Sequence, residues 1–263
     1  MILLAIESAT DCAGVAVVRD GDGSAERTHM GGRAHAEHLA PAIEEACALT
    51  GCAVTDIDQI AVDVGPGLFT GLRVGVATAK ALAQALGIGV LGVGSLDILA
   101  AAAWDRAGAG ATGPVVAVVD ARRGEVFAAA YHRQRGAGLP DPATVREDRL
   151  EAMAPAALEA WLLVLAAGGR RVTVVGDGAL RYRERLSAHG ALDLGLADEL
   201  SAPPPLAQAH LARRRLAGGV APAAPADLVP DYRRAADARI NWEQRVPAPG
   251  RIATEGARKG PAG

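Results

Sequence analysis

The segment "DVGPGLFTGLRVGVATAKALAQALG", residues 63–87, constrains the fold of this chain more than any other stretch. It runs from an apolar strand through a sharp Gly-Pro-Gly turn, residues 65–67, into a long helix. One face of this helix is an apolar stripe and another is a ridge of small residues, so the helix is buried on both sides and requires a layered fold. The stripe consists of Leu72, Val76, Ala83 and Leu86, and the ridge of Gly71, Gly75, Thr78 and Ala79.

The glycines of this segment fit neither common phosphate-binding template. Gly65, Gly67 and Gly71 are spaced GxGxxxG, whereas a dinucleotide fingerprint needs its third glycine at position 70, which is Thr70. A Walker A loop needs Gly-Lys-Ser/Thr at its end, and the segment does not contain that triplet. We therefore favour close helix packing or docking, with Thr70 as the helix cap. Phosphate binding stays open as the second interpretation.

The rest of the first 107 residues alternates between predicted strands and helices. Two strands, at 2–6 and 13–20, form a hairpin, and a more exposed strand follows at 25–30. Apolar spacing then predicts a helix from His35 to Cys47, strands at 59–64 and 87–94, and a helix at 96–104 capped by Ser95. The predicted tip of the hairpin carries Glu7, Ser8, Thr10 and Asp11.

A second lobe is predicted after a link rich in Gly and Ala at 105–113. It opens with "GPVVAVVDARRGEVFAAAYHR", two strands about an Arg-Arg-Gly turn. Both lobes thus begin with a hairpin and continue as alternating strands and helices. We expect an N-terminal lobe at 1–107, a C-terminal lobe at 108–245 and a disordered tail at 246–263. Further elements of the second lobe are predicted as helices at 156–167, 178–188 and 205–217 and a strand at 171–176.

The composition of the chain argues against several classes of protein. The apolar runs are too short to span a bilayer and the start lacks signal-peptide features, so we expect a cytoplasmic protein with no membrane contact. Three cysteines without a CxxC pair indicate free thiols rather than a disulfide framework. The net charge of −3 and an aromatic content of 3% give no general attraction to RNA. Any RNA contact must then come from a partner or from a local patch. The candidate patch is Arg213–Arg215, followed by Arg233, Arg234, Arg239 and Arg245.

Three segments together resemble the TsaB family, also called YeaZ. They are "LLAIESATDCAGVAVV", "GPGLFTGLRVGVATAKALAQALGIGVLGVGSLDILA" and "VVDARRGEVFAAAY", and the later "PDYRRAADARINWEQR" is similar to that family's closing P-x-Y-x-R segment. The resemblance implies an α/β, two-lobed fold like that of actin, the large heat-shock chaperones and sugar kinases, which is ribonuclease H-like. It also implies a non-catalytic partner in the machinery that transfers a threonylcarbamoyl group to the adenosine beside the tRNA anticodon.

The same resemblance implies a nucleotide cleft that has lost its chemistry. In this fold the hairpin tip touches nucleotide phosphate and the acid at position 7 lies near a metal. The related catalytic subunit TsaD binds its metal through an HxxxH pair, and Ser95 and Leu99 stand at those positions here. We therefore expect no catalytic residue, metal or cofactor. The vestigial cleft is expected to contain Glu7, Ser8, Thr10, Asp11 and Asp120.

Partner binding is implied for the helices at about 35–50 and 70–86. The expected partners are a TsaD-like catalytic subunit and a TsaE-like ATPase, with tRNA bound through the complex. Alone, the same faces can form a homodimer. The expected interface residues are His35, Leu39, Gly71, Arg73, Gly75, Thr78 and Lys80.

Each site has an alternative interpretation. Glu7 and Asp11 can hold Mg²⁺ through water or simply be solvated turn residues. Asp120 can face the cleft or be a charged flank of a hairpin. An ATP-binding phosphotransferase of the same fold is one rival function. A metallo-glycoprotease using His35 and His38 is the other, although zinc proteases space their histidines four apart and place Glu after the first.

Overall fold

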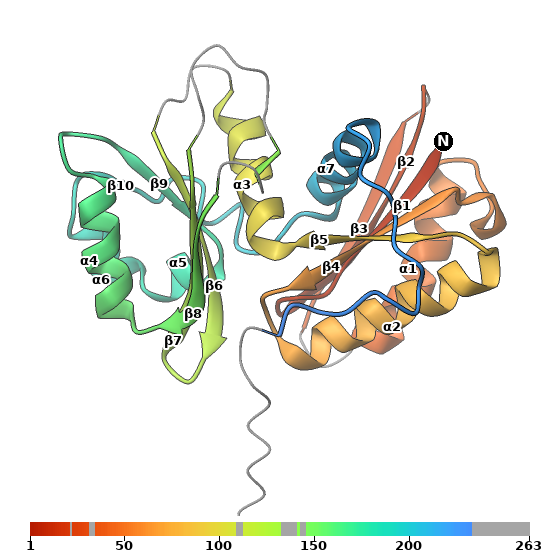
Figure 1. Ribbon diagram of the computed structural model, residues 1–263, viewed down its shortest axis with the longest axis horizontal. Coiled ribbons are helices and arrows are strands. Elements are labelled where there is room, and N and C mark those ends of the chain that lie inside the picture. The colour runs from red at the N-terminus through yellow and green to blue at the C-terminus, as the bar shows by residue number, and fades with distance from the viewer. Residues whose placement is uncertain (22, 32–34, 109–112, 133–140, 143–145, 233–263) are drawn as a thin grey trace, which may run out of the picture.

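The computed structural model describes residues 1–21, 23–31, 35–108, 113–132, 141–142 and 146–232. Figure 1 shows two lobes, each a twisted sheet with helices packed against it. The first lobe contains β1 (Ile2–Glu7), β2 (Cys12–Arg19), β3 (Ser24–Met30), α1 (His35–Leu49), η1 (Val54–Asp56), β4 (Gln59–Gly65), α2 (Phe69–Leu86), β5 (Val90–Gly94) and α3 (Ser95–Ala107). The elements that follow are β6 (Val115–Arg122), β7 (Glu125–Tyr131), β8 (Arg146–Met153), α4 (Pro155–Leu165), β9 (Val172–Val175), α5 (Asp177–Arg181), α6 (Arg183–Ser187), β10 (Leu192–Asp193) and α7 (Pro205–Ala217).

The two sheets repeat one topology. The first has the order β3-β2-β1-β4-β5 and the second the order β10-β9-β6-β7-β8, so each is a five-stranded sheet with its first strand in the middle. In both, the first three strands are antiparallel neighbours and the last two run parallel to the first. This duplicated arrangement confirms the predicted two-lobed, ribonuclease H-like α/β fold.

Strand alternation explains why each sheet is covered on both faces. Along β1, Leu4 and Ile6 point into a core shared with α1 and α2. Leu3 and Ala5 point the other way, into a core shared with α3 and α7. Since successive side chains of a strand face opposite sides, a strand with every residue apolar needs two covering layers.

Helix α3 lies between the two sheets and belongs to both cores. Ten consecutive residues, Ser95–Trp104, are buried. Ile98 and Ala101 pack on the first sheet, while Leu96 and Leu99 pack on the second. A helix that is buried all round in this way is the main connection between the lobes, as Figure 1 shows.

Helix α7 corrects the predicted boundary between the lobes. Although it follows the second lobe in sequence, it packs on β1 and β2 of the first sheet. The buried Gln208 side chain donates a hydrogen bond to the Ile6 carbonyl oxygen at 3.1 Å, and the Leu206 N–H donates to Glu26 Oε1 at 2.9 Å. The chain therefore returns to the first lobe after β10, and 108–245 is not one continuous lobe.

Other predictions need smaller corrections. Strands β8 and β10 were not predicted, and the helix predicted at 178–188 is divided into α5 and α6 at Tyr182. Thr70 does not cap α2, whose cap position is Leu68, and Ser95 does not cap α3, whose cap position is Gly94. The predicted tail at 246–263 lies outside the described residues.

Candidate functional site

Two carboxylates meet where β1 and β4 end side by side. The strands are parallel neighbours with Ile6 opposite Val62, so the next residues, Glu7 and Asp63, lie at the same edge of the sheet. Both side chains are fully buried. Glu7 was predicted as a cleft residue, whereas Asp63 was not. The available signal for Asp63 was an acid near the end of an otherwise apolar strand, "QIAVDV".

The hydrogen bonds of this pair leave one free oxygen on each carboxyl group. Glu7 Oε1 accepts from the Ala9 N–H at 2.8 Å. Asp63 Oδ1 accepts from the Gly65 N–H and from Ser95 Oγ, both at 2.7 Å. Glu7 Oε2 and Asp63 Oδ2 are buried without a donor from any other described residue.

A proton shared between the two carboxyl groups satisfies both free oxygens. Burial, followed by the charge and hydrogen bond of Asp63, raises the pKa of Glu7 well above its usual value. Burial also raises the pKa of Asp63, while hydrogen bonds from Glu7, the Gly65 N–H and Ser95 oppose that rise. Glu7 is therefore the protonated member and donates to Asp63. Its side chain is fully buried, so it is not a solvated turn residue.

The glycines of the opening segment make room for the tip of the chain's own hairpin. A Cβ on Gly71 would lie 2.0 Å from the Ser8 carbonyl oxygen, and one on Gly75 would lie 2.2 Å from Ser8 Oγ. A Cβ on Gly67 would lie 2.2 Å from the Ala9 carbonyl oxygen. Ser8 Oγ also donates to the Gly71 carbonyl oxygen at 2.9 Å. Close packing is thus what these glycines provide, since each of them lies against residue 8 or 9 of the same chain.

An arginine bridges the two lobes across the predicted cleft. Arg122 donates to Asp11 Oδ1 at 2.8 Å and lies 3.4 Å from Asp120 Oδ2. Asp120 is 7% exposed and also accepts from Arg181 Nη1 at 2.7 Å. The structure thus joins Asp11 and Asp120 through guanidinium groups that sequence reasoning did not place there.

Asp177 lies beside Asp120 in the second lobe. Its Oδ1 accepts from the Asp120 N–H at 2.8 Å. Burial, with a further contribution from the charge of Asp120, raises the pKa of Asp177 to about 6. Thr10 belongs to the same region, where its Oγ1 accepts from the Cys12 N–H at 3.2 Å and closes the hairpin turn.

Most of the predicted interface residues contact their own chain. Leu39 and His35 are buried, and His35 lies against Gly71. Lys80 Nζ donates to the carbonyl oxygens of Ala226 and Leu228 at 3.3 and 3.1 Å. Gly71 and Gly75 are in contact with Ser8, as described above. Thr78 Oγ1 donates to the Val74 carbonyl oxygen at 2.8 Å within α2.

The exposed residues of α2 include only one predicted interface residue, Arg73; the others are Phe69, Thr70, Ala77, Ala81, Gln84 and Ala85. Arg73 and Ala77 are exposed, and the Arg73 guanidinium lies 3.9 Å from the centre of the Phe69 ring, which is itself 40% exposed. The predicted docking ridge of small residues is therefore an internal contact. An exposed strip around Arg73 and Ala77 is what α2 offers to another molecule.

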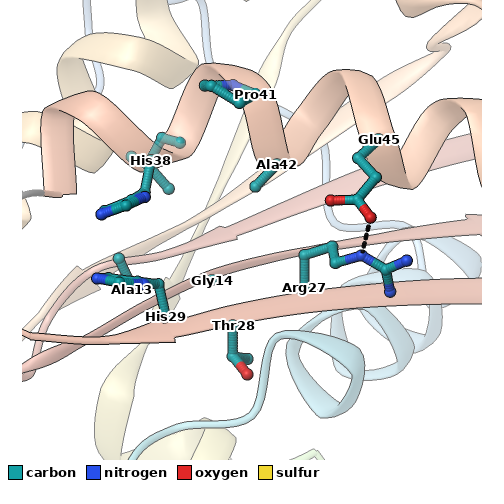
Figure 2. A pocket seen from close by; sticks show the side chains of 10 residues that line it. Ala13, Gly14, Arg27, Thr28, His29, His38, Pro41, Ala42 and Glu45 are labelled. Carbon is teal, nitrogen blue, oxygen red and sulfur yellow. Dashed lines mark ion pairs between the residues drawn. The ribbon is translucent and has the colours of Figure 1, made fainter.

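A polar pocket lies between α1 and strands β2 and β3, of which β3 is the edge strand of its sheet (Figure 2). The His29 and His38 rings stack there with their centres 3.5 Å apart, and Arg27 forms an ion pair with Glu45 at 2.8 Å. His35, the other histidine proposed for a peptidase, is buried, and burial lowers its pKa. His38 thus pairs with His29 rather than with His35. Among the described residues, no three His, Cys, Asp or Glu side chains form a group able to hold a metal ion.

A second polar network joins the lobes on the other side of α3. Asp97 accepts from the Tyr131 hydroxyl at 2.9 Å, Arg146 at 3.1 Å and Arg215 at 2.8 Å, and Arg215 also pairs with Asp141. Sequence reasoning missed this network, because its members come from four distant segments. Two further arginines of the predicted RNA patch pair within the chain, Arg213 with Asp20 and Arg214 with Asp105 at 4.0 Å. Its other members, Arg233, Arg234, Arg239 and Arg245, lie outside the described residues.

Comparison with known proteins places the chain in a family. The family model described as TsaD, tRNA N6-adenosine threonylcarbamoyltransferase, matches residues 26–184. The Bacillus subtilis tRNA threonylcarbamoyladenosine biosynthesis protein TsaB is 30% identical over 249 residues, which are 92% of this chain and 98% of that protein. The chain belongs to the TsaB family.

Further TsaB relatives agree with this placement. The Escherichia coli K12 TsaB protein is 37% identical over 133 residues, which are 51% of this chain and 56% of that protein, so this match spans little more than half of the relative. The crystal structure of YeaZ from Pseudomonas aeruginosa has a TM-score of 0.65 and 28% identity, covering 87% of this chain and 98% of that one. Among the described residues, no helix combines the length and apolar character needed to cross a bilayer.

Proposed function

We propose that this chain is a non-catalytic subunit in the formation of threonylcarbamoyladenosine on tRNA, where it binds and supports a TsaD-like catalytic subunit. The observation that carries the proposal is how the residues of the predicted cleft are used. Glu7 and Asp63 are buried side by side, Ser8 packs against Gly71 and Gly75, and Arg122 bridges Asp11 and Asp120. These residues serve internal contacts, so the cleft supports the architecture of the chain rather than a reaction.

The positions that correspond to the TsaD histidines support the same proposal. The Ser95 hydroxyl donates a hydrogen bond to Asp63, and Leu99 is fully buried in the core between α3 and the second sheet. A hydroxyl and a buried aliphatic side chain do not provide the two imidazoles that such a metal site uses. We therefore place the chemistry on the partner, with a TsaE-like ATPase and the tRNA joining the complex.

The exposed strip of α2 is the part of the chain that we propose for partner contact, together with the solvent face of α1. Helices α1 and α2 pack side by side on one face of the first sheet, so their outer faces form one continuous surface. Arg73 and Ala77 are exposed on α2, and Glu37 and Glu44 are exposed on α1. A charged surface of this kind suits a partner with complementary charges.

A binding experiment with a matched control tests this surface. Ala77→Arg adds a long charged side chain to the exposed face of α2, and Val164→Arg does the same on α4 of the second lobe, where Val164 is 67% exposed. We expect Ala77→Arg to abolish co-purification with a TsaD-type subunit while Val164→Arg binds like the wild type. Equal binding by both variants would show that the surface is misplaced.

A reconstituted reaction tests the function itself. Purified TsaD-type and TsaE-type proteins, threonylcarbamoyl-adenylate and tRNA are combined with and without this chain. We expect modified tRNA to form only when the chain is present, and the chain alone to show no ATP turnover. Modification without the chain, or ATP turnover by the chain that is lost in Asp120→Asn, would favour the rival phosphotransferase function.

A further inference from the structure

The C-terminal end of α1 places two cysteines side by side. The Cys52 N–H donates to the Cys47 carbonyl oxygen at 3.0 Å, and the Gly51 N–H donates to the Ala48 carbonyl oxygen at 3.1 Å. Gly51 has the left-handed φ of +67°. These two bonds and the left-handed glycine define a Schellman motif, in which the residue three before the helix cap and the residue two after it are in contact. In this chain both of those residues are cysteine.

The surroundings of the pair hold the two thiols together. Cys52 Sγ lies 3.5 Å from the Cys47 carbonyl oxygen, and Thr50 Oγ1 lies 3.3 Å from Cys52 Sγ. Thr50 also donates to the Ala46 and Cys47 carbonyl oxygens, each at 3.0 Å, which fixes the last turn of the helix. These backbone and hydroxyl contacts hold Cys52 against the residue that carries the other thiol.

The two thiols differ in their access to solvent. Cys47 is 1% exposed and lies in the core beneath α1, whereas Cys52 is half-buried at the edge of that core. Burial, and next the neighbouring Cys52, raise the pKa of the Cys47 thiol to about 12. Since the thiolate is the form that reacts, Cys47 does not react first with a dissolved oxidant. Cys52 is the member that an oxidant can reach.

We propose that Cys47 and Cys52 are an oxidisable pair, which a peroxide-class oxidant converts to a disulfide across the end of α1. The Cys52 thiol is first oxidised by peroxide to a sulfenic acid, with release of one water. The Cys47 sulfur then attacks the Cys52 sulfur, and the hydroxyl group leaves as a second water with the Cys47 proton. The two thiols are oxidised, the peroxide is reduced, and reduction by a thiol restores the pair.

The third cysteine provides a matched control. Cys12 is buried on β2 and its thiol lies 3.9 Å from the Ala13 carbonyl oxygen, in a different element from the pair. Cys12 is therefore a thiol like the other two, but it does not belong to the pair at the end of α1. The proposal does not depend on the proposed role in tRNA modification, since it uses only the geometry of α1.

Equilibration of the full chain in glutathione redox buffers tests the pair. The effective concentration of the Cys47–Cys52 bridge is measured in the folded chain and in urea, with peptide mapping of the bridged cysteines. We expect a value at least about tenfold higher in the folded chain, because the fold holds the thiols together. Hydrogen peroxide should remove two of the three free thiols in the wild type. The bridge should not form in Cys52→Ser, whereas it should still form in Cys12→Ser.

Three results would overturn the proposal. One is an effective concentration no higher in the folded chain than in urea, which would mean that the fold disfavours the bridge. Another is conversion of Cys52 to sulfinic acid by peroxide with no bridge formed. The last is a mapped disulfide that contains Cys12. Mapping of the wild type decides among these results even where a variant fails to fold.

Discussion

At the scale of single residues, the buried Glu7–Asp63 pair makes the stability of this chain depend on pH. Folding raises the pKa of Glu7 above its unfolded value, which is about 4.3. Below that value Glu7 is protonated in both states. As the pH rises above it, the unfolded state loses the proton and the folded state keeps it, so stability falls until the folded pKa is passed.

We expect Glu7→Gln to flatten this dependence. The glutamine amide can donate to Asp63 as the protonated acid does, while its oxygen still accepts from the Ala9 N–H. One retained proton gives a slope of about 1.4 kcal/mol per pH unit, so the variant should gain on the wild type as the pH rises from about 4.3 towards the folded pKa of Glu7. Urea unfolding at several pH values measures this, and parallel curves for the two proteins would contradict the shared proton.

Gly75 gives a second prediction at this scale. Its added Cβ would lie 2.2 Å from Ser8 Oγ but 3.4 Å from Ser8 Cβ, so the hydroxyl is the main obstacle. Gly75→Ala should lower the free energy of unfolding by about 1–3 kcal/mol, as overpacking does. In a Ser8→Ala background most of that loss should disappear. A double-mutant cycle by urea unfolding measures the coupling, and additive effects would mean that other atoms resist the methyl group.

Because of this contact, a substitution at Gly75 is a poor test of partner binding. A large side chain at Gly75 would disrupt the hairpin tip before it reached another molecule. Loss of binding in such a variant therefore reports on folding, which is why Ala77 is the better probe of the outer face.

At the scale of elements, the sequence predicts the helices and strands that a local pattern of apolar and turn residues defines. Both hairpins, α1, α2, α3 and α4 follow from apolar spacing and from turn residues such as the Arg-Arg-Gly turn at 122–124. Strand β8 was missed because its sequence, "REDRLEAM", is mostly polar and resembles an exposed segment. It lies at the edge of its sheet, where one neighbour suffices and the apolar signal is weak.

The position of α7 and the partner of Glu7 could not be predicted for a different reason. Gln208 and Ile6 are in contact although 202 residues separate them, and Asp63 meets Glu7 only because β1 and β4 are neighbours. Periodicity identifies a helix and an apolar face but not which sheet covers that face. Of the candidate site, the hairpin-tip residues and Asp120 were therefore predictable, whereas Asp63, Arg122 and the Asp97 network required the fold.

The docking of α7 depends on one glycine of β2. A Cβ on Gly14 would lie 2.7 Å from Pro205 Cγ and 3.0 Å from the Arg27 carbonyl oxygen. Gly14→Ala should therefore loosen the first turn of α7 and lower the free energy of unfolding by about 1–3 kcal/mol. Gly190→Ala is the control, because no atom lies near its added Cβ. Hydrogen exchange measures the effect, and unchanged protection of α7 in Gly14→Ala would rule out this contact as its anchor.

At the scale of the whole molecule, two polar contacts bridge the lobes and differ in burial. The Arg122–Asp11 ion pair is open to water, with side chains 43% and 55% exposed. The second bridge is made by Asp97 of α3, which accepts from Tyr131 and Arg146 of the second lobe and from Arg215 within the first lobe. The side chains of Arg215 and Asp97 are only 9% and 5% exposed. Water and salt screen the first pair, whereas removal of a partner from the second leaves a buried charge.

We therefore expect the two bridges to respond differently to substitution. Asp97→Ala should lower the free energy of unfolding by about 3–5 kcal/mol, because Arg215 and Tyr131 lose a buried acceptor. Arg122→Ala should lower it by less than about 1 kcal/mol, and that loss should vanish in high salt. Urea unfolding at low and high salt measures both effects. A large, salt-resistant loss in Arg122→Ala would instead mean that the cleft arginine, rather than the network beside α3, holds the lobes together.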